Sequence, residues 1–119
     1  MATLVYVQNL RALWADLPGN LTIDQWRQTV ADFGGMCAYC QTRPYIDLEH
    51  FIPVELGGGT TVGNCVPACK SCNGRKRRKH PDELDDEVWH GRIGQIRAYL
   101  ATRQSAVMFA VNGEAAACA

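Results

Sequence analysis

Two C-x-x-C pairs constrain this chain more than any other feature of its sequence. Cys37 and Cys40 form the first pair, Cys69 and Cys72 form the second, and 28 residues separate them. Such paired knuckles are typical of a tetrahedral zinc site, in which four thiolates fill the coordination shell and leave no position for water. We therefore expect a structural zinc ion that joins two distant loops.

Other uses of the cysteines compete with this interpretation. The six cysteines are an even number, as in a secreted disulfide framework, but the N-terminus has no charged region before an apolar one. We therefore expect no signal peptide and a reducing, cytoplasmic compartment. Redox-active C-x-x-C pairs remain an alternative, although two pairs are harder to explain in that way than one. We expect Cys65 to be a small buried residue and Cys118 to be an incidental thiol of the tail.

Composition excludes several broad classes. The chain has 119 residues, of which 47% are apolar, and its 12 Lys and Arg residues balance 12 Asp and Glu residues. This size suits one domain, and the balance argues against a uniformly basic nucleic-acid-binding protein and an acidic disordered chain. No stretch approaches the roughly 18 apolar residues of a membrane-spanning helix, so we expect no membrane partner.

Local patterns predict a mixed α+β fold. Thr22 and Gln25 form a capping box in front of a helix expected at 23–33, which Gly34 and Gly35 end. The other expected elements are a loosely helical segment at 4–16, strands at 45–52 and near 62–66, and helices at 70–79 and 92–104.

An acid and a histidine stand side by side between the two cysteine pairs. The imidazole of His50 can take a proton from water near neutral pH, and the carboxylate of Glu49 can hold a hard divalent cation. Asn73 would add an oxygen ligand if its helix meets the strand of Glu49, and Asn64 could orient the imidazole through its side-chain carbonyl. Each residue alone is more often a surface or turn residue, but their joint occurrence favours a site.

A run of basic residues lies beside these candidates. Residues 56–81 contain no Asp or Glu but six cations: Lys70, Arg75, Lys76, Arg77, Arg78 and Lys79. A helix that carries this charge suits the phosphates of a nucleic acid, whereas the ordinary alternative is a solvated helix face. Five acids between Asp82 and Glu87 hide the run in the total charge, and nothing in it reads a base sequence.

At these residues the sequence resembles the HNH endonucleases, of the zinc-clamped kind with a ββα-metal (His-Me finger) core. The resemblance covers about residues 22–90 and is strongest from Cys37 to Lys76. It is carried by the leading helix with Trp26 and Phe33, C-x-Y-C, the acid-His-x-x-Pro string, the glycine turn, Asn64 five residues before Cys69, and C-x-x-C-N-x-x-K. The arrangement in which Asn73 directly follows Cys72 also resembles recombination endonuclease VII of the same superfamily.

The resemblance implies a role for each matching residue. His50 would be the general base, Asn64 would position it, and Glu49 and Asn73 would hold a catalytic Mg²⁺ or Mn²⁺ ion. The four paired cysteines would hold structural Zn²⁺. Lys76 and Arg75 would touch the DNA backbone, with Arg77, Arg78 and Lys79 nearby. The nuclease domain would span 22–90, between an N-terminal extension at 1–21 and a C-terminal helix and tail at 91–119.

The sequence departs from the family pattern at three positions. Glu49 replaces the usual Asp or His before the catalytic histidine, and Gln41 replaces a Gly that often follows the first C-x-x-C. Asn73 stands where the last metal ligand is often His, and a neutral amide is a weaker ligand, so we expect low affinity for the ion.

Three hypotheses follow. The first is a metal-dependent endonuclease, phage- or prophage-encoded, that nicks or cuts DNA in the bacterial host cell and would cut both strands as a homodimer. The second is a non-catalytic, zinc-stabilised protein that binds DNA or phage packaging proteins. The third is a redox protein that uses its C-x-x-C pairs.

Overall fold

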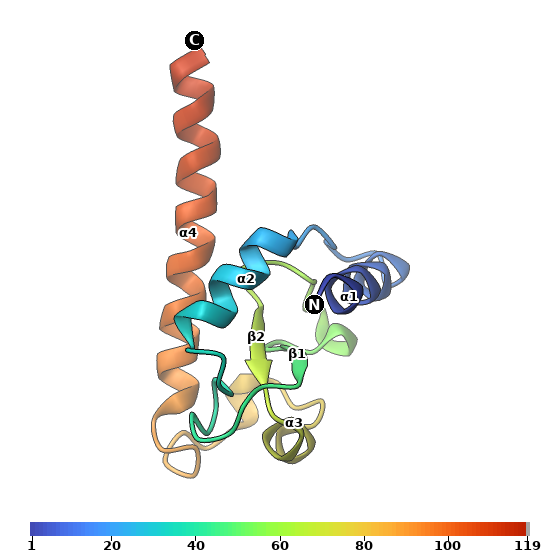
Figure 1. Ribbon diagram of the computed structural model, residues 1–119, viewed down its shortest axis with the longest axis vertical. Helices are drawn as coiled ribbons and strands as arrows, with labels where there is room; N and C mark the ends of the chain where they lie inside the picture. The colour runs from blue at the N-terminus through green and yellow to red at the C-terminus, as the bar shows by residue number, and fades with distance from the viewer. Residues whose placement is uncertain (119) are drawn as a thin grey trace.

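A computed structural model describes residues 1–118, and the side chains of residues 1–108. The chain forms four α-helices, two short 3-10 helices and a two-stranded sheet within the described residues. Figure 1 shows the hairpin of strands near the centre, with α1 and α4 on opposite sides of it. The expected α+β class is therefore confirmed.

The centre of the fold is a β-hairpin followed by a helix. Strand β1 (Asp47–His50) pairs antiparallel with β2 (Cys65–Ala68), so that His50 faces Cys65 and Glu49 faces Val66. Helix α3 (Lys70–Lys76) follows β2 after one residue. This arrangement is the ββα core that the resemblance implies.

Two helices from the N-terminal part of the chain cover one side of this core. Helix α1 is Ala2–Trp14 and helix α2 is Ile23–Asp32, which begins with the expected capping box of Thr22 and Gln25. Side chains from both helices share one apolar cluster with the hairpin and its loops: Val5, Leu21, Trp26, Leu48, Val62 and Cys65. The segment expected to be an extension thus packs directly on the strands.

A long C-terminal helix supports the other side. Helix α4 (Arg92–Cys118) runs along one edge, and its C-terminal part extends past the rest of the chain (Figure 1). Ile93, Ile96 and Leu100 are buried with Trp89 and Tyr39, as the helical spacing at 92–104 predicts. Within the described residues, no helix combines the length and the apolar content needed to cross a bilayer. The side chain of Cys118, which we expected to be incidental, lies outside the described residues.

The boundaries of several expected elements are wrong: the segments expected at 4–16, 45–52 and 92–104 lie at Ala2–Trp14, Asp47–His50 and Arg92–Cys118. Two further differences have a clear local cause. The second strand lies at 65–68 rather than near 62–66, because Thr61 and Asn64 form a turn in which Thr61 accepts from the amides of Asn64 and Cys65. The helix expected at 70–79 ends at Lys76, because Arg77 has a positive φ of 56°. Two 3-10 helices, at Val54–Leu56 and Pro81–Glu83, were not expected.

Candidate active site and metal centre

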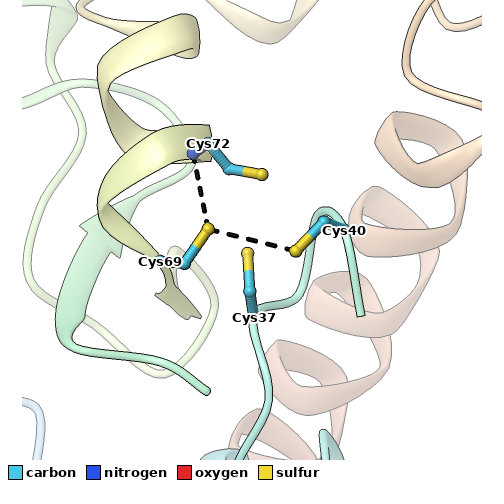
Figure 2. A group of neighbouring side chains, drawn as sticks. All are labelled: Cys37, Cys40, Cys69 and Cys72. Atoms are coloured by element: carbon cyan, nitrogen blue, oxygen red, sulfur yellow. Dashed lines mark hydrogen bonds between the residues drawn. The ribbon is translucent and has the colours of Figure 1, made fainter. Parts of the chain in front are cut away.

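The four paired cysteines meet in one cluster. Figure 2 shows Cys37 and Cys40 on the loop after α2, and Cys69 and Cys72 at the start of α3. Their four Sγ atoms all lie within 4.8 Å of one another, and the Sγ atoms of Cys40 and Cys69 are 3.9 Å apart. Four sulfur ligands in this arrangement fit a tetrahedral metal ion. The cluster joins two loops that 28 residues separate, as the spacing predicts.

The thiols of this cluster differ in their surroundings. Burial opposes ionisation of Cys40, but hydrogen bonds from the side chain and backbone of Thr42 and from the backbone of Arg43 outweigh it and lower the pKa to about 6. Burial raises the pKa of Cys72, which lies deeper. A metal ion would favour the thiolate at all four positions, because thiolates are its ligands.

The fifth cysteine plays no part in the cluster. Cys65 is 1% exposed and packs with Leu48 and Val62 in the apolar cluster under α1. Burial raises the pKa of its thiol, so Cys65 stays protonated. Its expected role as a small buried residue is confirmed.

Glu49, His50 and Asn73 line one cavity of about 310 Å³ on the surface of the ββα core. The structure therefore brings the end of β1 and the middle of α3 to one cavity, which is the condition for Asn73 to act beside Glu49. The other walls come from α1, from the segment after β1 and from the end of α3, and the side chains there include Gln8, Arg11, Glu55, Arg77 and Arg78.

Glu49 lines this cavity and is 5% exposed. One carboxylate oxygen accepts from the ammonium of Lys76 at 2.8 Å, and the other accepts from the hydroxyl of Tyr39. Burial raises the pKa of Glu49, whereas Lys76 and Tyr39 oppose that rise. Each carboxylate oxygen has two lone pairs, so both can accept a further partner.

His50 occupies the neighbouring position and is 6% exposed. Its Nε2 atom lies 2.8 Å from the hydroxyl of Thr60, and that hydroxyl lies 2.7 Å from the main-chain carbonyl of Gln8 in α1. Burial, and next the nearby charge of Arg11, lower the pKa of His50 to about 4. The imidazole is therefore neutral at pH 7.

Asn64 does not contact the imidazole, which corrects the expected role of its side-chain carbonyl. That carbonyl accepts from the amide of Ile52 at 2.8 Å, and its NH₂ group donates to the carbonyls of Ile52 and Gly59. Asn64 instead closes the loop that runs from the end of β1 to Gly59. The Nε2 atom of the ring bonds to Thr60 instead.

The basic residues after β2 separate into two groups. Lys76 is 0% exposed because it pairs with Glu49, so its ammonium does not face solvent in this structure. The other five, Lys70, Arg75, Arg77, Arg78 and Lys79, are exposed. Arg75 packs over the ring of Trp89 at 3.9 Å, and Arg78 lies 3.6 Å from Glu55 at the cavity rim.

The sequence did not point to several residues of the site, among them Gln8, Arg11, Tyr39 and Thr60. Gln8 and Arg11 come from α1, far from the motif, and only the fold brings them to the cavity. Tyr39 carried a usable signal, because it lies inside the first C-x-x-C pair, and the structure buries it with the cysteines. Thr60 follows the glycine turn, and no spacing rule connects it with His50.

Comparison with known proteins finds a similarity that includes the residues of the site. The family model for HNH endonuclease matches residues 37–88. The chain is also 34% identical over 68 residues to the SPbeta prophage-derived protein YoqL of Bacillus subtilis (strain 168), which is named as a candidate HNH endonuclease. That match covers 48% of this chain and 30% of YoqL, so the chain spans less than a third of that relative. No solved structure matches the chain significantly.

Proposed function

We propose that this chain is a divalent-metal-dependent HNH endonuclease that hydrolyses phosphodiester bonds of DNA, and the match of residues 37–88 to the HNH endonuclease family model supports this proposal. One observation carries the proposal. Glu49 and His50 from β1 and Asn73 from α3 line a single cavity beside basic side chains. A neutral imidazole, oxygen ligands and cations are the groups that such hydrolysis requires.

His50 acts as the general base in this proposal. It takes a proton from a water molecule whose oxygen forms a bond to phosphorus, while one ester bond from phosphorus to oxygen breaks. The leaving oxygen then takes a proton from solvent. The placement of His50 in the cavity supports this role, because a base must lie within hydrogen-bond reach of the water that it deprotonates.

Glu49 and Asn73 would hold the catalytic Mg²⁺ or Mn²⁺ ion. Their oxygens are the donor type that these hard cations prefer, and the remaining lone pairs of Glu49 leave it able to bind. When bound, such an ion supplies stabilisation of the negative charge on the phosphate and the leaving oxygen. The partial ligand set would leave positions for water and substrate.

The ion at the cysteine cluster would be Zn²⁺ with a structural role. Four thiolates complete a tetrahedral shell, so no position remains for a reacting water molecule. Its task would be to fix the start of α3 against the loop after α2. Asn73 follows Cys72 directly, so this ion would also fix one wall of the cavity.

Exposed cations around the cavity would contact the DNA backbone. Arg77 and Arg78 line the cavity, and Arg75 and Lys79 lie near them in the same exposed run. These contacts would hold phosphates without reading a base sequence. Lys76 would act indirectly in this structure, by holding Glu49.

A plasmid assay tests this proposal. Supercoiled DNA is incubated with the zinc-loaded protein in Mg²⁺, in Mn²⁺ and in EDTA, beside His50→Ala and a control, His90→Asn. His90 is exposed, lies outside the cavity and has a positive φ that Asn tolerates. We expect relaxed or linear product that requires the divalent ion, a loss of about 100-fold or more with His50→Ala, and no loss with His90→Asn.

One observation favours a second candidate, a non-catalytic DNA-binding or DNA-packaging accessory protein. Both carboxylate oxygens of Glu49 already accept hydrogen bonds within a buried network. If that network keeps the ion out, folded and zinc-loaded protein would bind DNA with an affinity that falls as salt rises, yet cleave nothing with either ion. If His50→Ala cleaved the plasmid as fast as wild type, that result would also contradict the proposed mechanism.

The biological setting is proposed on the same basis. The prophage origin of YoqL supports a phage or prophage gene that acts in the bacterial cytoplasm. One site per chain would nick a duplex, and a homodimer would cut both strands. Analysis of plasmid products together with light scattering distinguishes the two, and a pull-down with phage packaging proteins tests the accessory role.

A further inference from the structure

A chain of two hydrogen bonds connects the ring of His50 to helix α1. The Oγ1 atom of Thr60 lies 2.7 Å from the main-chain oxygen of Gln8 and 2.8 Å from Nε2 of His50. A carbonyl oxygen can only accept, and a threonine hydroxyl has one proton to give. Thr60 must therefore donate to Gln8 and accept from His50, which requires the proton of the neutral imidazole to be on Nε2.

We propose that Thr60, held by the carbonyl of Gln8, is a positioning residue that fixes His50 as its Nε2–H tautomer and leaves the Nδ1 lone pair to accept the proton of water. Only the transfer of a proton from water to Nδ1 rests on the proposed nuclease function; the tautomer itself does not. In that step the proton of water goes to Nδ1, and the imidazolium that forms keeps its Nε2–H on Thr60.

The opposite tautomer is disfavoured by burial. With the proton on Nδ1, a lone pair of Nε2 would face the oxygen of Thr60, whose own proton is already given to Gln8. The 0% exposed hydroxyl of Thr60 would then lose a buried partner that water could not replace. Nδ1 has no hydrogen-bond partner among the described residues, and the ring belongs to a residue that lines the cavity, so the Nε2–H form leaves the Nδ1 lone pair free to accept a proton.

The backbone around Thr60 is fixed independently of its side chain. Its amide donates to the carbonyl of Pro18 at 2.8 Å, and its carbonyl accepts from the amides of Asn20 and Leu21 at 3.1 Å each. The side chain of Asn9 in α1 bonds both backbone groups of Leu21. Residues 1–21 lie outside the segment that the family model matches, yet they set the position of the group that orients the base.

Asn64 contributes to the same arrangement from the other side. Its NH₂ group donates to the carbonyl of Gly59, the residue directly before Thr60, at 2.9 Å. Asn64 can therefore influence His50 through the loop that ends at Thr60, without a direct contact. This route explains how Asn64 could position the base although its side chain bonds to the backbone.

Nitrogen NMR on the intact, zinc-loaded protein tests the tautomer without any catalytic ion or DNA. The three histidines are labelled with ¹⁵N, and His50→Gln identifies the signals of His50. We expect Nε2 of wild-type His50 to carry the proton and Nδ1 to appear unprotonated. A wild-type ring with its proton on Nδ1 would overturn the inference even if the protein cleaves DNA.

Variants of Thr60 supply the functional test. Thr60→Val removes the hydroxyl, whereas Thr60→Ser keeps it. We expect Thr60→Val to mix the two tautomers of His50 and to lower kcat by about 10- to 100-fold with little change in KM. We expect Thr60→Ser to keep the wild-type tautomer and the wild-type kcat. Thr29→Val is the matched control, because Thr29 is also buried and donates to a carbonyl, but lies away from the cavity.

The two proposals can fail separately. Unchanged kcat and an unchanged tautomer in folded Thr60→Val would contradict the role of Thr60 while leaving the nuclease intact. An absence of cleavage by wild-type protein would contradict the nuclease while the tautomer measurement still stands. If Thr60→Val does not fold, the wild-type tautomer and the kcat of Thr60→Ser decide the question.

Discussion

The ammonium of Lys76 lies 2.8 Å from the carboxylate of Glu49, with both side chains buried. It also donates to the main-chain carbonyl of His50 at 3.3 Å. The contact therefore ties the last residue of α3 to the end of β1, where the two proposed catalytic-site residues stand. The hydroxyl of Tyr39 completes the arrangement from the loop of the cysteine cluster.

Lys76→Ala should destabilise the protein strongly. It leaves the buried carboxylate of Glu49 without its cation, and such losses cost about 3–5 kcal/mol. The free energy of unfolding from urea titrations of zinc-loaded protein measures this. Lys79→Ala is the control, because Lys79 is exposed and its replacement should change stability by less than about 0.5 kcal/mol. An equal, small effect of both substitutions would show that the pair with Glu49 contributes little.

Lys76 also shows where charge patterning stops being informative. In sequence it is one of five consecutive cations, all of which suit a phosphate-binding surface. Helical geometry separates it from its neighbours, because Lys76 follows Cys72 by four residues and so shares its buried face. The position of Cys72 thus carried a signal that the charge count alone conceals.

The other residues of the site also differ in whether the sequence could predict their position. The cysteine cluster follows from two C-x-x-C pairs, whose spacing is typical of a metal site. Glu49 and Asn73 line one cavity because α3 lies against β1, which their spacing alone does not fix. The contact of Thr60 with Gln8 joins residues 52 positions apart, and it depends on how α1 packs on the hairpin. A local sequence pattern does not show how α1 packs on the hairpin. The sequence alone therefore points to Asn64, rather than to Thr60, as the partner of the imidazole.

Gly58→Ala should disrupt the loop between the strands. An added Cβ atom would lie 1.7 Å from the carbonyl oxygen of Ile52 and 2.7 Å from Nδ2 of Asn64, so the backbone must shift. The glycine turn is therefore a packed segment rather than a merely flexible one. We expect a loss of at least about 1–3 kcal/mol in thermal or urea unfolding.

Gly74→Ala provides the contrast for this prediction. Gly74 lies in α3, and nothing is within 4 Å of its added Cβ atom. Alanine should therefore stabilise the helix by about 0.5–1 kcal/mol. If both glycine substitutions changed stability by the same amount and in the same direction, close packing at Gly58 would not be the cause.

Removal of the metal from the cysteine cluster should unfold the core. Structural zinc sites contribute apparent binding free energies of about 10–16 kcal/mol, which is more than a domain of this size usually has to spare. We expect a strong chelator to abolish cooperative unfolding followed by circular dichroism, and Cys72→Ser to lower the bound zinc measured by atomic absorption. Cys65→Ala should retain one zinc per chain, since Cys65 lies outside the cluster. Equal zinc loss in both variants would contradict this assignment.

The attachment of α4 to α2 should weaken in acid. Burial opposes the charge on Asp32, but hydrogen bonds from Tyr99 at 2.7 Å and Gln28 at 2.8 Å, and the charge of Arg103, outweigh it and lower the pKa of Asp32. A lowered folded-state pKa gives stability that is present above the unfolded value of 3.8 and is lost as pH falls through the folded value. Wild type should therefore exceed Asp32→Asn in unfolding free energy near neutral pH, by less than about 1 kcal/mol because the carboxylate is exposed. The difference in unfolding free energy between the two proteins should shrink below about pH 4. Metal loss in acid affects both proteins alike and so does not change this difference. A difference that stays constant from about pH 6 to about pH 3 would contradict the prediction.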